Sequence, residues 1–543
     1  MTAPVTSADR PAAGHAPAPP PDHDGRRSRA RGAAGGRPSW VAVAATGVAV
    51  VTVLPVLVVV GAALAADPAA TARFLLRPRV AELLGNTVAL VVLSGAACLV
   101  IGTGAGWLVE RTALPLRGLW RVLLVAPLAV PAFVNSYAWV SLRPGTDGLA
   151  GAVLVTTLSY FPFVFLPVAA ALRGLDPALE ESARSLGLRR TAVFVRVVLP
   201  QLRTAALGGL LLVTLHLLAE FGALELIRFP TFTVAILEQY DTSFTGASAE
   251  VLAVVLVALC LGLLALEQAA RGRARYARLG PGTRRRAEAV PLGWWTAPAL
   301  AGVAGLVALA LAVPLGSLVR WLGADDDAFS ETASDAAALV PAALTTVGLA
   351  VTAAAVTVLA AFPVAWLVTR RRGRAAALVE RATYVASSLP GVVVALALVT
   401  LTVRNVPALY QSSALLVTAY VVLFLPRAVV SLRAALAQAP PELAEAARAL
   451  GVGPWGALLR VVVPLALPGA LAGFALVLVA TSTELTATLL LAPTGTRTLA
   501  TGFWSASASL DYAAAAPYAA LMVALSAPLI WLLLRRPDEE VRR

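Results

Sequence analysis

The sequence contains no lysine, so all 43 of its basic residues are arginine. A Walker-type phosphate loop requires a lysine, and the chain therefore cannot be an ATPase of that kind. Charged residues are also scarce, at 13% of the chain, where soluble domains carry about 25%. Cysteine is limited to Cys98 and Cys260. Both lie inside apolar runs, and we expect them to be packing residues rather than a disulfide or a metal site.

Apolar residues make up 59% of the 543-residue chain, where a soluble domain carries roughly 45–50%. They form continuous runs of more than about 18 residues, separated by short arginine-rich segments, which is typical of a helical membrane protein. A transmembrane β-barrel is excluded because its strands would alternate in polarity. The arginines flank the runs, so the net charge of +13 indicates a protein that contacts a lipid bilayer and no nucleic acid.

Twelve such runs follow a hydrophilic tail, residues 1–38, which lacks the apolar core of a signal peptide and is expected to be disordered. The runs cover about 40–66, 83–108, 119–142, 149–172, 204–227, 250–267, 293–322, 342–369, 378–403, 412–433, 466–492 and 513–534. Each can cross about 30 Å of hydrocarbon as a helix. The basic stretch 268–292 is expected to be a linker. The predicted fold class is therefore an all-α polytopic membrane protein with about twelve transmembrane helices.

The distribution of arginine predicts the orientation of the chain. With the N-terminus inside the cell, the cytoplasmic segments contain 34 arginines and the external segments contain 8, as the positive-inside rule requires. The external segment 323–341 is instead acidic and is a candidate contact for an external partner. Both ends, including the short tail 536–543, are therefore expected in the cytoplasm of a multi-pass cell-membrane protein.

The first six runs and the last six are copies of each other. They align at an offset of 259 residues and, after a five-residue insertion, at an offset of 264. The matched pairs include Thr87 and Thr346, Trp107 and Trp366, Arg111 and Arg370, Pro131 and Pro390, Pro177 and Pro441, Gly187 and Gly451, Pro200 and Pro464, and Glu220 and Glu484. An even number of spans in each half, 39–267 and 293–535, predicts two parallel repeats related by an axis along the membrane normal.

The best-matched segments are hydrophilic and lie between the fourth and fifth runs of each half. They read DPALEESARSLGLRRTAVFVRVVLPQL at 176–202 and PPELAEAARALGVGPWGALLRVVVPLA at 440–466. An early proline, early glutamates and a later glycine predict a short helix, a sharp turn and a second helix in each. A helix lying on lipid is the alternative, but both segments carry Glu as well as Arg, and the same shape occurs twice.

These segments resemble the EAA signature, E-[AS]-A-x3-G-x9-[IV]-x-[LV]-P, of binding-protein-dependent ABC importer permeases. The signature is met by Glu181, Ser182, Ala183 and Gly187, and again by Glu445, Ala446, Ala447 and Gly451, with Ser182 as the only departure. The resemblance covers residues 40–535 and implies a type I ABC importer permease fold whose EAA helices bind two cytoplasmic ATPase subunits. It also implies that the partners use ATP, that this chain is not an enzyme and binds no cofactor, and that an extracytoplasmic substrate-binding protein delivers the cargo.

Within that family, the fused layout with LAEFGA at 218–223 and STELTATLLL at 482–491 most resembles iron(III) transport permeases. Permeases for thiamine, phosphonate, polyamines and oxyanions have related architectures and remain alternatives. A secondary transporter with two parallel six-helix halves would show the same hydropathy, but it has no reason to display the EAA pair. A membrane-embedded enzyme is not supported, because no cluster of His, Asp or Cys has ligand or nucleophile spacing.

Three intramembrane residues are candidates for the substrate path. Glu220 and Glu484 occupy equivalent positions in the fifth run of each half, and Glu220 is placed in the outer half of the hydrocarbon. A carboxylate facing lipid there would cost on the order of several kcal/mol, so both should face protein, a partner or water. His216 shares a helix face with Glu220. One such pair is a poor metal site, and the alternative is a polar pair satisfied by neighbouring helices.

Overall fold

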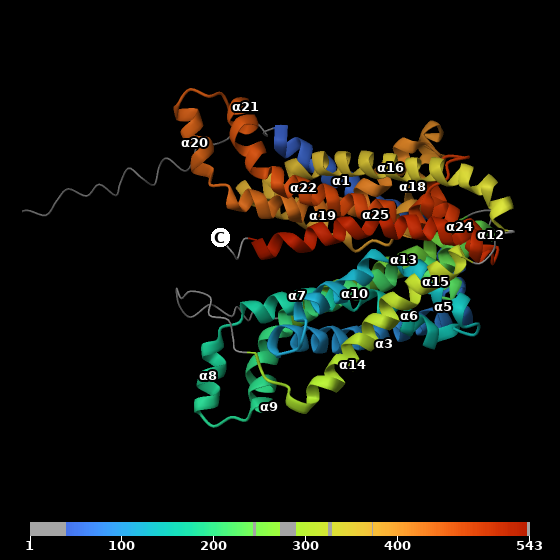
Figure 1. Ribbon diagram of the computed structural model, residues 1–543. Helices are drawn as coiled ribbons and strands as arrows, with labels where there is room; N and C mark the ends of the chain where they lie inside the picture. The colour runs from blue at the N-terminus through green and yellow to red at the C-terminus, as the bar shows by residue number, and fades with distance from the viewer. Residues whose placement is uncertain (1–39, 243–245, 272–288, 324–327, 372, 540–543) are drawn as a thin grey trace, which may run out of the picture.

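The computed structural model describes residues 40–242, 246–271, 289–323, 328–371 and 373–539. In these residues the only β pairing is a single parallel bridge between Thr112 and Val290, and the chain is otherwise helices and their connections (Figure 1). The all-α prediction is therefore confirmed. The predicted N-terminal tail and linker residues 272–288 lie outside the described residues.

The described helical elements are divided between the two halves. The first half contains α1 (Trp40–Ala65), α2 (Pro68–Leu75), α3 (Pro78–Arg111), α4 (Arg117–Val125), η1 (Ala126–Ala129), α5 (Ala132–Leu142), α6 (Gly148–Tyr160), α7 (Pro162–Gly174), α8 (Pro177–Ser185), α9 (Arg190–Val193), η2 (Phe194–Val198), α10 (Leu199–Ala219), α11 (Gly222–Leu226), α12 (Phe232–Thr242) and α13 (Ala247–Arg271). The second contains η3 (Gly293–Trp295), α14 (Thr296–Val307), η4 (Ala308–Ala312), α15 (Val313–Leu322), α16 (Ala328–Arg370), α17 (Arg374–Ser387), α18 (Gly391–Asn405), η5 (Pro407–Leu409), α19 (Ser413–Gln438), α20 (Pro441–Ala449), α21 (Pro454–Ala457), η6 (Leu458–Val462), α22 (Val463–Ser482), α23 (Thr486–Leu491), α24 (Leu499–Ala508) and α25 (Tyr512–Glu539).

Nine helical segments of the described chain are long and apolar enough to cross a membrane, and a bent pair raises the number to ten. The sequence predicted about twelve. The difference arises first at Pro131 and Pro390, the matched prolines of the third run in each half, where the backbone is extended with ψ of 145° and 147°. A proline cannot continue the helix hydrogen bonding, and α4–η1 meets α5 at 91°. In α25 the apolar stretch, Tyr512–Pro528, is shorter than a full span.

A π turn occurs in three membrane spans, near the start of two of them and in the middle of Gly293–Leu322. The turns η2, η4 and η6 each end two residues before a proline, namely Pro200, Pro314 and Pro464. Proline cannot donate to the carbonyl four residues back, and its ring collides with that carbonyl, so the helix widens locally by one residue. Because η2 and η6 lie near the ends of the two EAA segments, each half has the same irregularity where its loop enters the fifth span.

Glycines let the helices of each half cross closely. A Cβ added to Gly209 of α10 would lie 2.7 Å from the carbonyl oxygen of Phe163 in α7. A Cβ added to Gly469 of α22 would lie 2.6 Å from the carbonyl oxygen of Ser431 in α19. Small residues permit such backbone approach in lipid, where van der Waals packing must hold helices together. The pairs α7–α10 and α19–α22 are therefore equivalent tight contacts in the two repeats.

The first helix of each repeat packs on the other repeat. Helix α1 lies against α16, α17 and α18 in addition to α13. At its start, Trp40 stacks on Trp455 with ring centroids 5.0 Å apart. In return, α15 packs on α5 and α25, and η4 contacts α6 and η1. The two repeats are therefore joined by an exchange of helices that the sequence analysis did not anticipate.

We predict that the two repeats still assemble when the chain is broken in the linker. Cutting the chain near residue 281 and co-expressing the two fragments should leave transport close to that of the uncut chain. No span is cut, and each fragment offers its first helix to the other through the helix exchange. Uptake and co-purification through a tag on one fragment measure the outcome. Fragments that reach the membrane at parental levels but fail to co-purify would contradict this prediction.

The EAA segments lie together at one end of the molecule. Helices α8, α9, α20 and α21 lie at this end, with α8 and α20 on opposite sides, whereas α5, α12 and α24 lie at the other end (Figure 1). We call these the EAA end and the far end. The start of α1 and the end of α25 lie at the EAA end as well (Figure 1). Helix α25 continues to Glu539, so the predicted boundary at 535 falls inside it.

Candidate functional site

Both EAA segments form a short helix that a glycine closes. Gly187 and Gly451 follow α8 and α20 with φ of +84° and +81°. In each case the glycine N–H bonds to the carbonyl three residues back, at 2.9 and 3.0 Å, and the next N–H bonds to the carbonyl five residues back. This is the Schellman arrangement, and the positive φ is what the sequence predicted. A Cβ at either glycine would meet nothing within 4 Å, so the requirement is purely conformational.

The signature residues are divided between two faces of these helices. Glu181, Ser182, Glu445 and Ala446 are exposed, Ala183 is buried and Ala447 is half-buried. The first two signature positions therefore face away from the chain, and the third faces it. The same division in both repeats is expected of a segment that is held by the membrane helices on one side and leaves the other side free for a partner.

Each EAA helix also presents leucines at equivalent positions. Leu186 and Leu450 are 83% and 85% exposed, and Leu179 and Leu443 are 40% and 46% exposed. The two leucines of a pair are seven residues apart, and the second is the C-cap of the helix, which places them on the same side of it. Exposed large apolar side chains that recur at one place mark an interaction surface. The structure therefore places an apolar edge on α8 and another on α20.

An ion pair holds the first EAA helix to the membrane helices. Arg111, the last residue of α3, pairs with Glu180 of α8, and the two side chains are only 8% and 12% exposed. In the second repeat Ala444 occupies the position of Glu180, and Arg370 instead donates to the Ala439 carbonyl at 2.9 Å. The two EAA helices are thus attached differently. The sequence matched Arg111 with Arg370 but did not reveal the partner of either.

We predict that Glu180→Gln loosens the first EAA helix and leaves the second unchanged. Breaking a buried pair leaves an uncompensated charge, which typically costs about 3–5 kcal/mol. Hydrogen exchange over 177–186 should therefore accelerate by about ten-fold or more, while exchange over 441–450 stays at the parental rate. Glu181→Gln, at the adjacent exposed carboxylate, is the matched control. Equal exchange in the two variants would show that the ion pair does not hold α8.

Tyr160 brings together two of the predicted path residues. Its hydroxyl donates to Oε2 of Glu220, and its ring centroid lies 5.6 Å from that of His216. The sequence predicted that Glu220 lies inside a continuous helix. In the structure α10 ends at Ala219, and Glu220 follows as its C-terminal cap. Tyr160 was missed in the sequence, since a lone tyrosine in an apolar run has the appearance of a packing residue.

Glu220 and Glu484 bind the backbone in the same way in the two repeats. Oε1 of Glu220 accepts the Ala223 N–H at 2.9 Å, and Oε1 of Glu484 accepts the Ala487 N–H at 3.0 Å. Each carboxylate therefore satisfies the first turn of a short helix, α11 or α23. Both side chains are half-buried, and they are close enough for their charges to interact. The structure thus brings the two glutamates into one region between the halves.

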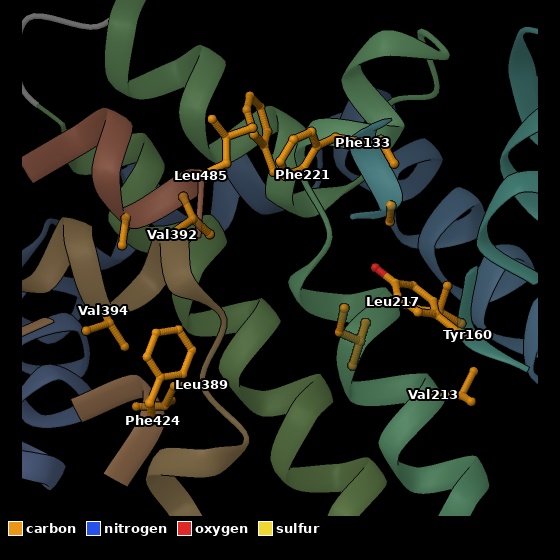
Figure 2. Packing of buried hydrophobic residues seen from close by; sticks show 14 of the residues in the cluster. Phe133, Tyr160, Val213, Leu217, Phe221, Leu389, Val392, Val394, Phe424 and Leu485 are labelled. Atoms are coloured by element: carbon orange, nitrogen blue, oxygen red, sulfur yellow. The ribbon is translucent and has the colours of Figure 1, made fainter. Parts of the chain in front are cut away.

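An apolar contact joins the two halves next to this region. Leu485 of the second half lies beside Phe221 and Phe133 of the first, whereas Tyr160 and Phe424 lie on opposite sides of the view (Figure 2). The Phe221 ring also lies 5.1 Å from that of Trp504, measured between centroids. We call the contact among Phe133, Phe221, Leu485 and Trp504 the apolar seal. Glu220 and Glu484, two of the predicted path residues, directly precede Phe221 and Leu485 in the chain.

The two cysteines are buried, as the sequence predicted. Cys98 and Cys260 are both unpaired and fully buried, and the Cys98 thiol donates to the Thr157 carbonyl at 3.7 Å. Over the described ranges, no group of three or more His, Cys, Asp or Glu side chains converges as a metal site.

The profile of a known family matches both repeats. Binding-protein-dependent transport system inner membrane components match residues 99–275 and 356–535, and each matched range contains one EAA segment. The chain belongs to this family. The permease is thus a multi-pass component of a membrane transport system and not an enzyme, and the secondary-transporter alternative is set aside.

Proteins similar to the permease are named for different cargoes. It is 33% identical to the Fe(3+)-transport system permease protein FbpB 2 of Haemophilus influenzae, over 91% of the permease and 98% of the relative. It is 28% identical to the sulfate transport system permease protein CysW of Synechocystis sp., over 34% of the permease and 75% of the relative. It is 31% identical to a probable molybdenum ABC transporter permease protein of Haloferax volcanii, over 34% and 73%.

Proposed function

We propose that the permease forms the translocation path of an ABC importer for iron(III) and is coupled to two cytoplasmic ATPase subunits through α8 and α20. The EAA pair carries the proposal, because two helices at one end of the molecule share the same glycine closure and the same exposed leucines. The absence of lysine from the chain supports assigning ATP hydrolysis to partner subunits.

Iron is favoured over other cargoes by the extent of similarity. The relative named for Fe(3+) transport aligns with nearly the whole of both chains, whereas the sulfate and molybdenum relatives align with about a third of the permease. The fused two-repeat layout supports the same choice. An extracytoplasmic binding protein would deliver the ferric ion to the far end, and the arginine distribution supports a cytoplasmic location for the EAA end. The acidic segment proposed as its contact, 323–341, is described only in part, with α16 beginning at Ala328.

The attachment of α8 suggests how movement of the ATPase subunits would be transmitted to the membrane helices. When ATP closes the two ATPase subunits, α8 and α20 move with them, and the Arg111–Glu180 ion pair makes α3 follow α8. The halves would then approach each other at the EAA end and separate at the far end, which opens the apolar seal. ATP drives this change only through its different affinity for the two states of the complex.

Reconstitution of the complete transporter tests the proposal. The permease, its ATPase and its binding protein are placed in vesicles, and uptake of radioactive iron(III), sulfate, molybdate and spermidine is measured separately. We expect iron uptake that requires both ATP and the binding protein. Uptake of another cargo in place of iron would correct the substrate, and uptake that persists without ATP would overturn the coupling.

A further inference from the structure

Arg427 lies in the middle of a membrane helix. At 1.5 Å per residue it is about 21 Å from the start of α19 and about 16 Å from its end. A guanidinium at this depth is costly unless it meets protein, water or a ligand. The side chain is half-buried, and Cζ lies 5.0 Å from the centroid of the Phe424 ring. Apart from this cation–π contact, the Arg427 side chain makes no hydrogen bond or ion pair within the described part of the chain, although the Arg427 carbonyl accepts from the Ser431 hydroxyl.

The Arg427 guanidinium interacts electrostatically with charged or titratable groups of both halves. It is within electrostatic range of His216 in α10 and of Glu484, which follows α22. Since His216 belongs to the first repeat and Arg427 to the second, the arginine stands in the region between the halves and not against lipid. Phe424, over which the arginine lies, and Tyr160, beside His216, mark the two sides of this region (Figure 2).

This positive charge has no counterpart in the first repeat. At the offset that aligns Pro167 with Pro426, the position of Arg427 is occupied by Val168, which is fully buried. The arginine therefore serves no structural need that is common to the two copies. Its single occurrence in a path built from two similar halves indicates a role that concerns the cargo.

The nearby carboxylates do not satisfy the guanidinium. Glu484 lies beyond ion-pair distance and accepts the Ala487 N–H, while the two oxygens of Glu220 accept hydrogen bonds from Ala223 and Tyr160. The glutamates thus have protein donors, whereas the donors of Arg427 are unused. A guanidinium presents five N–H donors in a planar fork, which matches the paired oxygens of carboxylate, phosphate or sulfate groups.

We propose that Arg427 forms an oxyanion-binding subsite halfway along the translocation path, with His216 on the opposite wall. The proposal rests on the path assigned under the proposed function. Charges interact strongly away from bulk water, so the guanidinium opposes the passage of a bare trivalent cation. The unused N–H donors of the guanidinium are then met by an oxyanion group of the cargo at this level. Either an oxyanion is itself the cargo, or an oxyanion accompanies the ferric ion.

The local electrostatic potential tests the subsite without any cargo. A reporter thiol is placed by His216→Cys in the full transporter, with the buried Cys98 and Cys260 replaced by alanine. Its reaction rates with an anionic and a cationic methanethiosulfonate reagent are compared. We expect Arg427→Gln to lower the ratio of anionic to cationic rate by about ten-fold or more, and Arg427→Lys to retain it. Arg404→Gln, at an exposed arginine in the last turn of α18, is the control. An unchanged ratio in Arg427→Gln, or a thiol unreactive with and without ATP, would overturn the subsite.

Uptake by the reconstituted transporter identifies the source of the oxyanion. Radioactive sulfate, molybdate and phosphate are each offered alone, and phosphate is also offered together with ferric ion. Uptake of an oxyanion that is offered alone indicates that a free oxyanion is the cargo. Uptake of phosphate only in the presence of ferric ion indicates that the oxyanion is bound to the metal. In either case Arg427→Gln should lower uptake by about ten-fold or more. Iron uptake at the parental rate in Arg427→Gln, with no oxyanion entering, would overturn the subsite. If the parental transporter takes up no iron, the iron(III) proposal fails instead, and the potential measurement still decides the subsite.

Discussion

Replacement of Gly187 or Gly451 by valine should lower transport by about ten-fold or more, with protein levels in the membrane near normal. Both glycines have positive φ, +84° and +81°, which a β-branched residue adopts only with strain of about 1–3 kcal/mol. No atom lies within 4 Å of an added Cβ, so the loss would come from backbone conformation alone. The Schellman closure of α8 or α20 would then open and misplace the exposed leucines.

Asparagine provides the matched control for these variants. Gly187→Asn and Gly451→Asn add a side chain of similar bulk, but asparagine tolerates the left-handed conformation. Transport should therefore remain close to the parental rate in both. The double valine variant should be more impaired than either single one, since both ATPase contacts would be affected. Parental rates of ATP-dependent uptake in the two single valine variants would show that α8 and α20 do not couple ATP to transport.

A second large effect is expected at Glu220 and Glu484. Each carboxylate both accepts a backbone N–H and stands in the region between the halves. Glutamine keeps an acceptor oxygen for Ala223 or Ala487 and removes the charge, so Glu220→Gln with Glu484→Gln should assemble normally. If the charges shape the path, uptake by this double variant should fall by about ten-fold or more. Alanine removes the acceptor as well, and the double alanine variant should also lose thermal stability.

The accessibility of positions 220 and 484 to water distinguishes a role in the substrate path from a purely structural role. Cysteines at 220 and 484, in a background without Cys98 and Cys260, should react with a water-soluble thiol reagent. Their reactivity should change when ATP is added, because the halves would move. Full uptake by the double alanine variant, with both cysteines unreactive in every state, would mean that the glutamates serve only to hold α11 and α23.

The sequence predicted those features that depend on local chemistry. The positive φ of Gly187 and Gly451 could be anticipated because a glycine after an amphipathic helix is a common way to end it. The repeat was visible because proline, tryptophan and glycine positions kept one register. Hydropathy located every membrane segment, but it could not show the break at Pro131 or Pro390, because a run of apolar residues has the same hydropathy whether or not its helix is interrupted.

Contacts between residues that are far apart in the chain could not be predicted from the sequence. Arg111 and Glu180 are separated by two membrane segments, and their pairing has no equivalent in the second repeat that could have revealed it. Tyr160 gains significance only from its contact with Glu220. Arg427 was located within the tenth run, yet its lack of a partner is a property of the packed structure.

The helix exchange also affects how the protein is made. Helix α1 is the first helix to emerge from the ribosome, but α16, the earliest of the three second-repeat helices on which it packs, begins about 290 residues later. At 5–20 residues per second this is a delay of roughly 15–60 s. During that time one face of α1 has only lipid or the insertion machinery as its neighbour. A chain that stops after the first repeat therefore lacks the surface on which this face of α1 packs, and we expect membrane proteases to degrade such an incomplete product.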